Sequence, residues 1–415
     1  MQTTMNSYIL NIGNFGKLTL FTFFIAVFFT GTIELISGVV LLVTIVASVL
    51  YLPTSVKILR NDVVFTKIYM YVTTAFLVVV LLHIAFGQTG SFGYGLPFSL
   101  SLTFIMALAI ATYFANTGQN AFKAIALASG AHATLLLLTS ISQIYLFGYE
   151  RAEGTINANI FAHILATSGG IFTIYLFLAI RTAPGLKSLA TLLGWLLLFL
   201  FGTHLTGTRG VIIAYYPLLL GLALASLVYF EERKFQTVLV LIIAIVFLTL
   251  LSQNAGRFAL GMSELSRTAS GLENQGSIGM RVGAWQEALR LIAERPITGH
   301  GLRYFSDFNT LPLDNPVQNF THVHNQYLDI WVKAGIGGLV FLLVFLGLPF
   351  FVGIKMLFRK LDLGVGLTLI WLSGSFMVFG LTEVFVNHTN TIVILATYIP
   401  LFLLLADGKI RSGTK

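Results

Sequence analysis

The sequence contains no cysteine and few charged residues. Without cysteine among its 415 residues, the chain has no disulfide bonds, thiolate nucleophiles or cysteine-ligated metals. Only 10% of the residues are charged and 56% are hydrophobic, whereas soluble domains carry roughly 25% charged residues. This composition excludes an ordinary soluble enzyme and indicates a protein that uses the bilayer as its solvent. The first apolar run, after Lys17, lacks a cleavage site of small residues, so we expect a retained span.

Long apolar runs make up most of the chain. They exceed roughly 18 residues, which favours transmembrane helices over barrel strands of about 10 alternating residues. The fold class that we predict is an all-α integral membrane protein with about 12 transmembrane helices. The expected spans are 16–30, 33–52, 65–87, 97–116, 121–147, 158–180, 187–204, 210–230, 235–251, 327–354, 363–382 and 390–406.

Lysine and arginine predict the orientation of these spans. The net charge is +8, and an N-in topology places most basic residues at cytoplasmic ends. The short outer loops then hold only Arg151 and Arg209. This is the asymmetry of the positive-inside rule, so we expect both termini in the cytoplasm. The basic balance therefore reflects membrane topology, and we expect no nucleic-acid partner.

One connection is far longer than the others and divides the chain into three parts. Residues 1–251 carry predicted spans one to nine, and residues 252–326 form a large outer loop. Residues 327–415 carry spans ten to twelve and a short cytoplasmic tail. Loops beyond about 15 residues are usually functional or disordered. Aromatic residues and helical periodicity within this loop favour a functional one.

The loop contains a predicted amphipathic helix that begins near Arg281 and stops at Pro296. A turn follows at Gly299-His300-Gly301. The residues expected to share its apolar face are Val282, Trp285, Leu289 and Ile292. A cation at a helix start is unfavourable by up to about 1 kcal/mol, which makes sense if Arg281 helps to hold an anion such as phosphate. The alternative is an arginine that reaches for lipid headgroups.

Arg209 is a second candidate for anion binding. It follows Thr206-Gly207-Thr208 in a turn between two apolar runs at the outer face. An interfacial anchor paired with a carboxylate is the alternative interpretation. Two outer arginines suit a diphosphate, because each guanidinium can bind phosphate oxygens through two donors.

The junction of the loop with the tenth span carries His322 and His324. A neutral imidazole at this position can accept a proton, so either histidine is a candidate general base. The two could also share a metal, but the accompanying ligand set is thin, and we expect neither metal nor cofactor. Three further residues at the outer face are secondary candidates: Asn325, Glu383 and His300. Gly335 and Gly338 predict close helix packing that would hold His324 rigidly.

At these residues the sequence resembles a known family. His324-Asn325, nine residues, Gly335, two residues and Gly338 reproduce a histidine pattern of bacterial O-antigen ligases. Thr206-Gly207-Thr208-Arg209 resembles their arginine motif, and the segment from Arg281 to Gly301 resembles part of their large periplasmic loop. The likeness covers about residues 200–340, and the N-terminal half resembles the family only in hydropathy.

The resemblance implies a lipid-linked-donor glycosyltransferase of the GT-C-like type in a Gram-negative inner membrane. It would transfer O-antigen from undecaprenyl diphosphate to a sugar hydroxyl of lipid A–core on the periplasmic side. The reaction would be metal-independent and would invert the anomeric configuration. Carried over, His324 would be the general base, and Arg209 and Arg281 would bind the diphosphate.

Three other functions compete with this one. An O-antigen polymerase or a protein O-oligosaccharyltransferase of the same superfamily would use a similar donor. A lipid-linked glycan transporter belongs to a different class. Paired charges at mid-membrane, or broken helices in two related halves, would favour a transporter, and we expect neither from the sequence.

Overall fold

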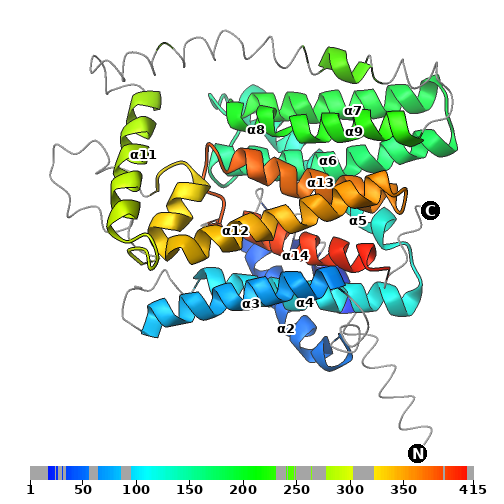
Figure 1. Cartoon of the computed structure of the whole chain (residues 1–415). Helices are drawn as coiled ribbons and strands as arrows, with labels where there is room; N and C mark the ends of the chain where they lie inside the picture. Colours follow the sequence, from blue (N-terminus) through cyan, green and yellow to red (C-terminus); the bar gives the residue numbers. More distant parts are fainter. Residues whose placement is uncertain are drawn as a thin grey trace, which may run out of the picture.

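The computed structural model is helical, with no strand in the part of the chain that it describes. Figure 1 shows most of its helices lying side by side, with axes that run roughly the same way. This agrees with the predicted all-α class. The described residues are 17–23, 25–26, 30, 34–55, 64–85, 95–229, 240, 242–246, 248, 263, 277–301, 322–386 and 388–408.

The helices follow the apolar runs closely. Asn120, Asn157 and Asp362 cap three of them with side-chain oxygens, a role for which Asn and Asp are preferred. The helices are α2 (Glu34–Ser55), α3 (Val64–Ala85), α4 (Gly95–Thr117), α5 (Ala121–Ile141), the π-helical η3 (Ser142–Leu146), α6 (Ala158–Thr182), α7 (Leu186–Leu205), α8 (Arg209–Ala214), α9 (Tyr216–Tyr229), α11 (Ser277–Glu294), α12 (Gln326–Phe358), α13 (Leu363–Phe379) and α14 (Thr389–Ala406).

Several helical segments have the length and composition to cross a membrane. Five shorter apolar helices accompany them, and together they fit a multi-pass membrane protein. The predicted ninth span, 235–251, lies mostly outside the described residues, and the total of about twelve spans stays a prediction. The five long segments are Ala121–Leu146, Ala158–Thr182, Leu186–Leu205, Gly210–Tyr229 and Gln326–Phe358.

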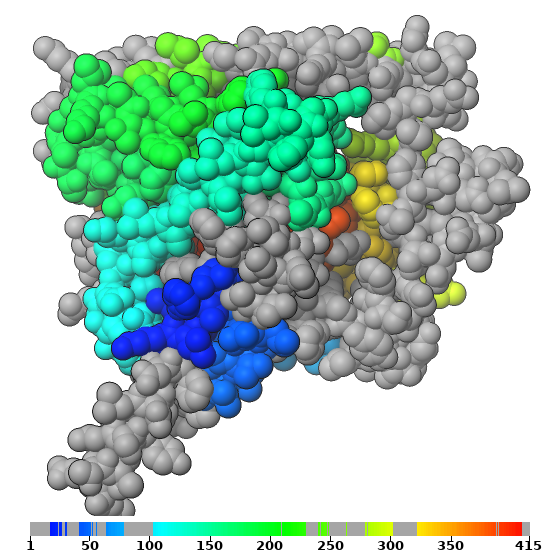
Figure 2. Space-filling model, turned by 180° about the vertical axis from the view of Figure 1, so that it is seen from behind, coloured from blue at the N-terminus to red at the C-terminus, as the bar shows by residue number. Residues whose placement is uncertain are grey.

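Helix α13 lies at the centre of the bundle. Every residue from 363 to 376 is buried, and the helix packs against α6, α9, α12 and α14. Trp371 donates a hydrogen bond from Nε1 to the carbonyl of Thr167 in α6, at 3.1 Å. Seen from behind, α2 in blue and α7 in green cover different parts of the same face (Figure 2). The central position of α13 fixes where the loop after it emerges.

The bundle has two ends of different character. At one end Lys355 of α12 lies over the ring of Phe65 in α3, and Arg181 of α6 lies over Tyr229 of α9. We call this the basic end, because it gathers Lys123, Arg181, Lys187, Lys355, Arg359 and Lys360. The opposite end, at which α6, α12 and α14 begin, is the site end.

Helix α11 forms within the long loop where the sequence predicts an amphipathic helix. Its buried face agrees with the prediction at Ile292 and Trp285, which pack with residues of α12. It differs at Leu289, which is 55% exposed, whereas Ala284 and Ala288 are fully buried. Together with Leu291 the two alanines form a row along one side of the helix that meets α12. Small side chains allow the two helix backbones to approach closely, so alanines occupy the contact and the larger Leu289 faces outward.

Helix α12 is interrupted at Gly335, whose backbone has φ +64° and ψ −163°. The turn at 296–301 fills the interruption. Ile336 donates its backbone N–H to Pro296 at 2.9 Å, and His300 and Gly301 donate theirs to Val332 and Lys333. A side chain at residue 335 would collide with the Ile297 carbonyl. Gly335 therefore packs against a turn of the loop. The sequence predicts that it packs against another helix.

Candidate functional site

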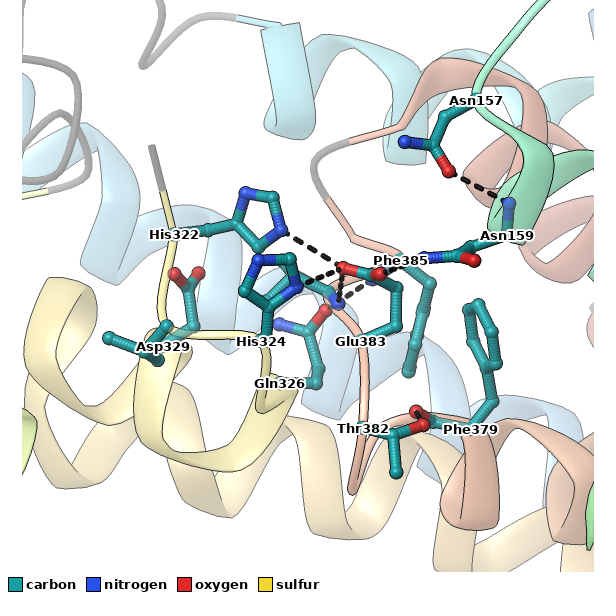
Figure 3. A network of polar contacts seen from close by, with 12 residues as sticks. Asn157, Asn159, His322, His324, Gln326, Asp329, Phe379, Thr382, Glu383 and Phe385 are labelled. Carbon is teal, nitrogen blue, oxygen red and sulfur yellow. Dashed lines mark hydrogen bonds and ion pairs between the residues drawn. The ribbon is translucent and has the colours of Figure 1, made fainter. Parts of the chain in front are cut away.

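Two histidines at the site end point at one carboxylate. Glu383 Oε1 accepts hydrogen bonds from His322 Nε2 at 2.9 Å and from His324 Nδ1 at 3.2 Å. Figure 3 shows both imidazoles turned toward Glu383 from the segment that precedes α12. Because a carboxylate only accepts, each of these nitrogens carries the hydrogen. In the neutral state the lone pair of His324 is therefore on Nε2.

The backbone around the histidines is held on both sides. Trp285 of α11 donates from Nε1 to the carbonyl of Val323, the buried residue between the histidines, at 2.9 Å. His324 has φ +48°, an uncommon value for a non-glycine residue. Asn325 then caps α12, with Oδ1 accepting from the N–H groups of Tyr327 and Leu328 at 3.0 and 3.1 Å. These contacts fix both rings relative to α11 and α12.

The loop between α13 and α14 supplies the carboxylate. Gln326, the first residue of α12, accepts from the N–H groups of Phe385 and Val386 through Oε1, both at 2.9 Å. Its own N–H donates to Gly380 at 2.7 Å. These three bonds join the start of α12 to the loop of Glu383 on both sides of that residue. The position of the Glu383 carboxylate relative to the two imidazoles is therefore fixed by several hydrogen bonds.

The environment keeps Glu383 ionised. Burial by itself would raise the pKa of Glu383, but hydrogen bonds from His322 and His324, and their charges, hold it well below the usual range. For His388, burial lowers the pKa, the charge of His322 lowers it further, and Glu383 opposes the shift. The site therefore combines one buried anion with two imidazoles that donate to it.

A third group approaches Glu383 from α6. Asn159 donates from Nδ2 to Glu383 Oε2 at 2.6 Å, on the side of the carboxylate away from the histidines. Its Oδ1 accepts from Thr208 Oγ1 at 3.1 Å and from Arg151 Nη2 at 3.3 Å. Arg151 also donates from Nε to the carbonyl of Thr206 at 2.8 Å. Asn159 is not identifiable from the sequence, because nothing local marks a residue 224 positions from its partner.

The predicted arginine motif lies next to this network. Arg209 begins α8 directly after Thr208, and the next residue, Gly210, lies against the Glu383 loop. A Cβ on Gly210 would lie 2.5 Å from Thr382 Oγ1. The backbone at Arg209 thus adjoins the residue before Glu383, and the direction of the Arg209 side chain lies outside what the structure describes.

Arg281 lies on the loop helix one turn before Trp285. Residues four apart lie on the same side of a helix, so Arg281 shares the side of α11 that holds Val323. Its side chain is partly exposed. The helix that carries Arg281 thus lies beside the segment of His322 and His324. In the same way, the start of α8, which carries Arg209, lies beside the loop of Glu383.

The structure places His300 away from the imidazole pair. His300 Nε2 donates to the carbonyl of Leu291 in α11 at 2.8 Å, and its N–H donates to Val332 at 2.8 Å. These contacts give it a part in fastening the turn to α11 and α12. Gly338 also has a local role, since a Cβ there would lie 2.6 Å from Ala334 Cβ.

A buried ion pair lies near the start of α12, toward the site end, and so does not bear on the expected absence of paired charges at mid-membrane. Lys333 Nζ lies 2.7 Å from Asp329 Oδ2, and the two side chains are 7% and 1% exposed. They are four residues apart on one helix, so their charges cancel locally.

His322, His324 and Glu383 could also hold a metal ion, since their ligand atoms all lie within 4.8 Å of one another. The distances to the shared Oε1, 2.9 and 3.2 Å, are those of hydrogen bonds. Three such ligands would also leave an open position, as catalytic zinc sites do. These three residues are therefore a candidate metal site as well as a hydrogen-bonded cluster, and a transfer assay with EDTA distinguishes the two.

Comparison with known proteins agrees with the sequence resemblance. A family model described as O-antigen ligase matches residues 194–343, a stretch that includes Arg209, Arg281 and His324 but not Glu383. An uncharacterized protein of Haemophilus influenzae is 28% identical over 247 residues, which are 56% of this chain and 60% of that protein. The chain thus covers less than two thirds of this relative. The family match supports placing the chain in the O-antigen ligase and polymerase superfamily.

Proposed function

We propose that this protein is an O-antigen ligase. It would transfer O-antigen polysaccharide from undecaprenyl diphosphate to a sugar hydroxyl of lipid A–core. The observation that carries the proposal is the bond from His324 Nδ1 to the ionised Glu383, beside the turn that begins at Thr206. This arrangement supplies a base next to a segment suited to an anionic leaving group.

His324 would act as the general base. With its hydrogen on Nδ1 facing Glu383, the imidazole can accept the proton of the acceptor hydroxyl on Nε2. The hydroxyl oxygen then bonds to the anomeric carbon from the face opposite the diphosphate, which inverts the configuration. Glu383 stabilises the imidazolium that forms, as a buried carboxylate does behind a catalytic histidine.

Arg209 and Arg281 would bind the departing diphosphate. The bond between the anomeric carbon and the phosphate oxygen breaks as the new glycosidic bond forms, so negative charge develops on undecaprenyl diphosphate. Fixed positive groups at that position lower the barrier. Two guanidinium groups supply such charge without a metal ion, and the backbones of both arginine segments adjoin the Glu383 and His322 region.

The distribution of charge supports a periplasmic site in an inner membrane. Lysines and arginines gather at the basic end of the described bundle, which the positive-inside rule assigns to the cytoplasm. The site end would then face the periplasm, and both termini the cytoplasm. The periplasm lacks ATP, so a glycosyl diphosphate donor would supply the driving force.

The direct test combines the purified protein with undecaprenyl-diphosphate-linked O-antigen and excess EDTA, with and without lipid A–core. The glycan-bearing product is identified by its mass on a gel. We expect glycan on lipid A–core only when that acceptor is present. Control reactions use His324→Ala protein and heat-inactivated protein.

Other products would identify the competing functions. Longer chains that stay on undecaprenyl diphosphate would indicate a polymerase, and glycan on an added pilin-type acceptor would indicate protein O-glycosylation. Transfer that requires added divalent metal would contradict metal independence and assign a metal to the two histidines and Glu383. Movement of intact lipid-linked glycan across vesicles without any transfer would indicate a transporter.

A further inference from the structure

We propose that Asn159 is a positioning residue that holds Glu383, and through it both imidazoles, in fixed relation to the Thr206–Arg209 turn. The proposal rests on the proposed function for its kinetic consequences. Its structural content stands separately, as three hydrogen bonds of one amide group. These bonds connect α6 with the turn before α8 and with the loop after α13.

The carboxamide of Asn159 serves as donor and acceptor at once. Its NH2 group donates to Glu383 Oε2 at 2.6 Å, while its carbonyl oxygen accepts from Thr208 and Arg151. Reversing the amide would turn its oxygen toward the carboxylate and its NH2 toward two donors. Thr208 and Arg151 therefore determine which end of the amide faces Glu383.

Glu383 needs this contact because its two oxygens have separate partners. Oε1 is shared by His322, His324 and the N–H of Val384, the last at 3.1 Å. Oε2 is bonded by Asn159 alone among the described contacts. A carboxylate held at one oxygen only can rotate about its last torsion, so the bond from Asn159 fixes the direction in which Oε1 points.

The same amide links the base to the donor turn. Thr208 directly precedes the short helix that starts with Arg209, and Arg151 donates hydrogen bonds to both Thr206 and Asn159. A displacement of this turn changes the acceptor contacts of Asn159 and hence its donation to Glu383. Base orientation and the position of the arginine segment are thereby coupled through one side chain.

The experiment compares Asn159→Asp, Asn159→Ala and Thr208→Val with wild type. Asn159→Asp keeps the shape but replaces the donor with a carboxylate oxygen facing Glu383. Asn159→Ala removes the group and leaves room for water. The matched control is Asn120→Ala, because Asn120 caps α5 at the basic end, where its side chain accepts from the N–H of Lys123.

We expect Asn159→Asp to lower kcat by about 10- to 100-fold, since a small misplacement of a catalytic group has effects of this size. Binding of undecaprenyl diphosphate should stay within about threefold of wild type, because the arginine segments are intact. Asn159→Ala should be less impaired than Asn159→Asp, and Thr208→Val should lose about three- to tenfold in kcat. A purely structural role predicts the reverse order, with the alanine variant worse than the isosteric aspartate.

A second measurement does not depend on activity. Nitrogen-15 spectra of labelled histidines report which ring nitrogen carries hydrogen and how it is bonded. We expect Asn159→Asp to shift the signals of His322 and His324, and Asn120→Ala to leave them in place. Unchanged signals in Asn159→Asp, or equal losses of kcat in the Asn120 control, would overturn the proposal. Shifted signals in a protein that transfers no glycan would contradict only the proposed function.

Discussion

The two ends of the bundle use polar side chains in opposite ways. At the basic end, polar groups fasten one helix to another or cap the helix they begin. Asp407 accepts from the N–H groups of Phe65 and Thr66 and from the Thr66 hydroxyl, which joins α14 to α3. Tyr229 donates to the Leu357 carbonyl of α12 at 3.1 Å. These contacts satisfy helix termini.

At the site end, polar side chains converge on one another. His322, His324 and Asn159 all donate to Glu383, from segments before α12 and at the start of α6. Backbone conformation does not separate the two ends, because the described non-glycine residues with positive φ are His324 here and Lys360 at the basic end. The comparison teaches that one end is built for joining helices and the other for holding a charge.

The largest expected effect comes from removing the base. His324→Ala should lower the rate of transfer by at least about 10²- to 10⁴-fold, the usual contribution of general base catalysis. Undecaprenyl diphosphate binding should survive, because it depends on the arginine segments. His204→Ala is the control, since His204 is an exposed histidine in the last turn of α7. Normal turnover in His324→Ala would contradict the assignment.

Glu383→Gln should have the next largest effect. The amide would present a donor where His324 now donates. Because the imidazole itself remains, we expect a loss no larger than that of His324→Ala, within the roughly 10⁴-fold cost of a comparable change behind a catalytic histidine. The measurement is kcat with saturating donor. Glu287→Gln makes the same chemical change on α11, where Glu287 pairs with Arg290, and should leave kcat unchanged. Equal activity of both variants would remove Glu383 from the mechanism.

Glu383 also predicts a pH dependence of stability. Its pKa in the folded state lies below the ordinary value of 4.5, so its ionised form stabilises the protein above that pH. This contribution is lost as the pH falls through the folded pKa. The difference in Tm between wild type and Glu383→Gln should be largest above about pH 5 and shrink toward pH 3. A gap that widens on acidification would mean that the carboxyl group is stabilised in its neutral form.

Arg281→Ala should weaken donor binding by about 10- to 100-fold, the equivalent of about 1.5–3 kcal/mol for hydrogen bonds to a charged group. Binding of undecaprenyl diphosphate to purified protein gives this value directly. Arg281→Lys should recover only part of it, because an ammonium group lacks the paired donors of guanidinium. Arg295→Ala, an exposed arginine just after α11, is the matched control. An equal effect of the two alanine variants would indicate general attraction to anions.

The smallest effect is expected at the basic end. Asp407→Asn should lower the free energy of unfolding by about 1 kcal/mol, the usual value of a helix-capping contact, with kcat unchanged. Thermal unfolding in detergent and the transfer assay together check it. A loss of kcat without a change in Tm would show that Asp407 affects catalysis and not stability, contrary to the contrast between the two ends.

The sequence predicts the helices well and the site only in part. Apolar length and charge determine where α5, α6 and α12 lie, because both are local properties of the chain. The histidine pair and Glu383 were also recognisable as polar residues at the outer ends of spans. Their mutual contact, and the contact of Asn159, join segments 59 and 224 residues apart. Contacts between residues so far apart in the sequence depend on which helices pack together. Hydropathy does not specify that packing.

The buried face of α11 illustrates the same limit. Periodicity correctly predicts a helix with an apolar side, but several faces of α11 carry apolar residues. The choice between Leu289 and the row of Ala284 and Ala288 depends on how closely α12 approaches. That approach is a property of the folded protein and is not visible in residue spacing.

The break in α12 has a consequence for the order in which the chain is assembled. The carbonyls of Val332 and Lys333 receive N–H groups from the turn at 296–301, and Ile336 donates back to Pro296. In a bilayer, backbone groups left without partners are costly. Synthesis runs from the N-terminus, so the turn exists before the helix that it completes. The turn is therefore available as a template when α12 is synthesised.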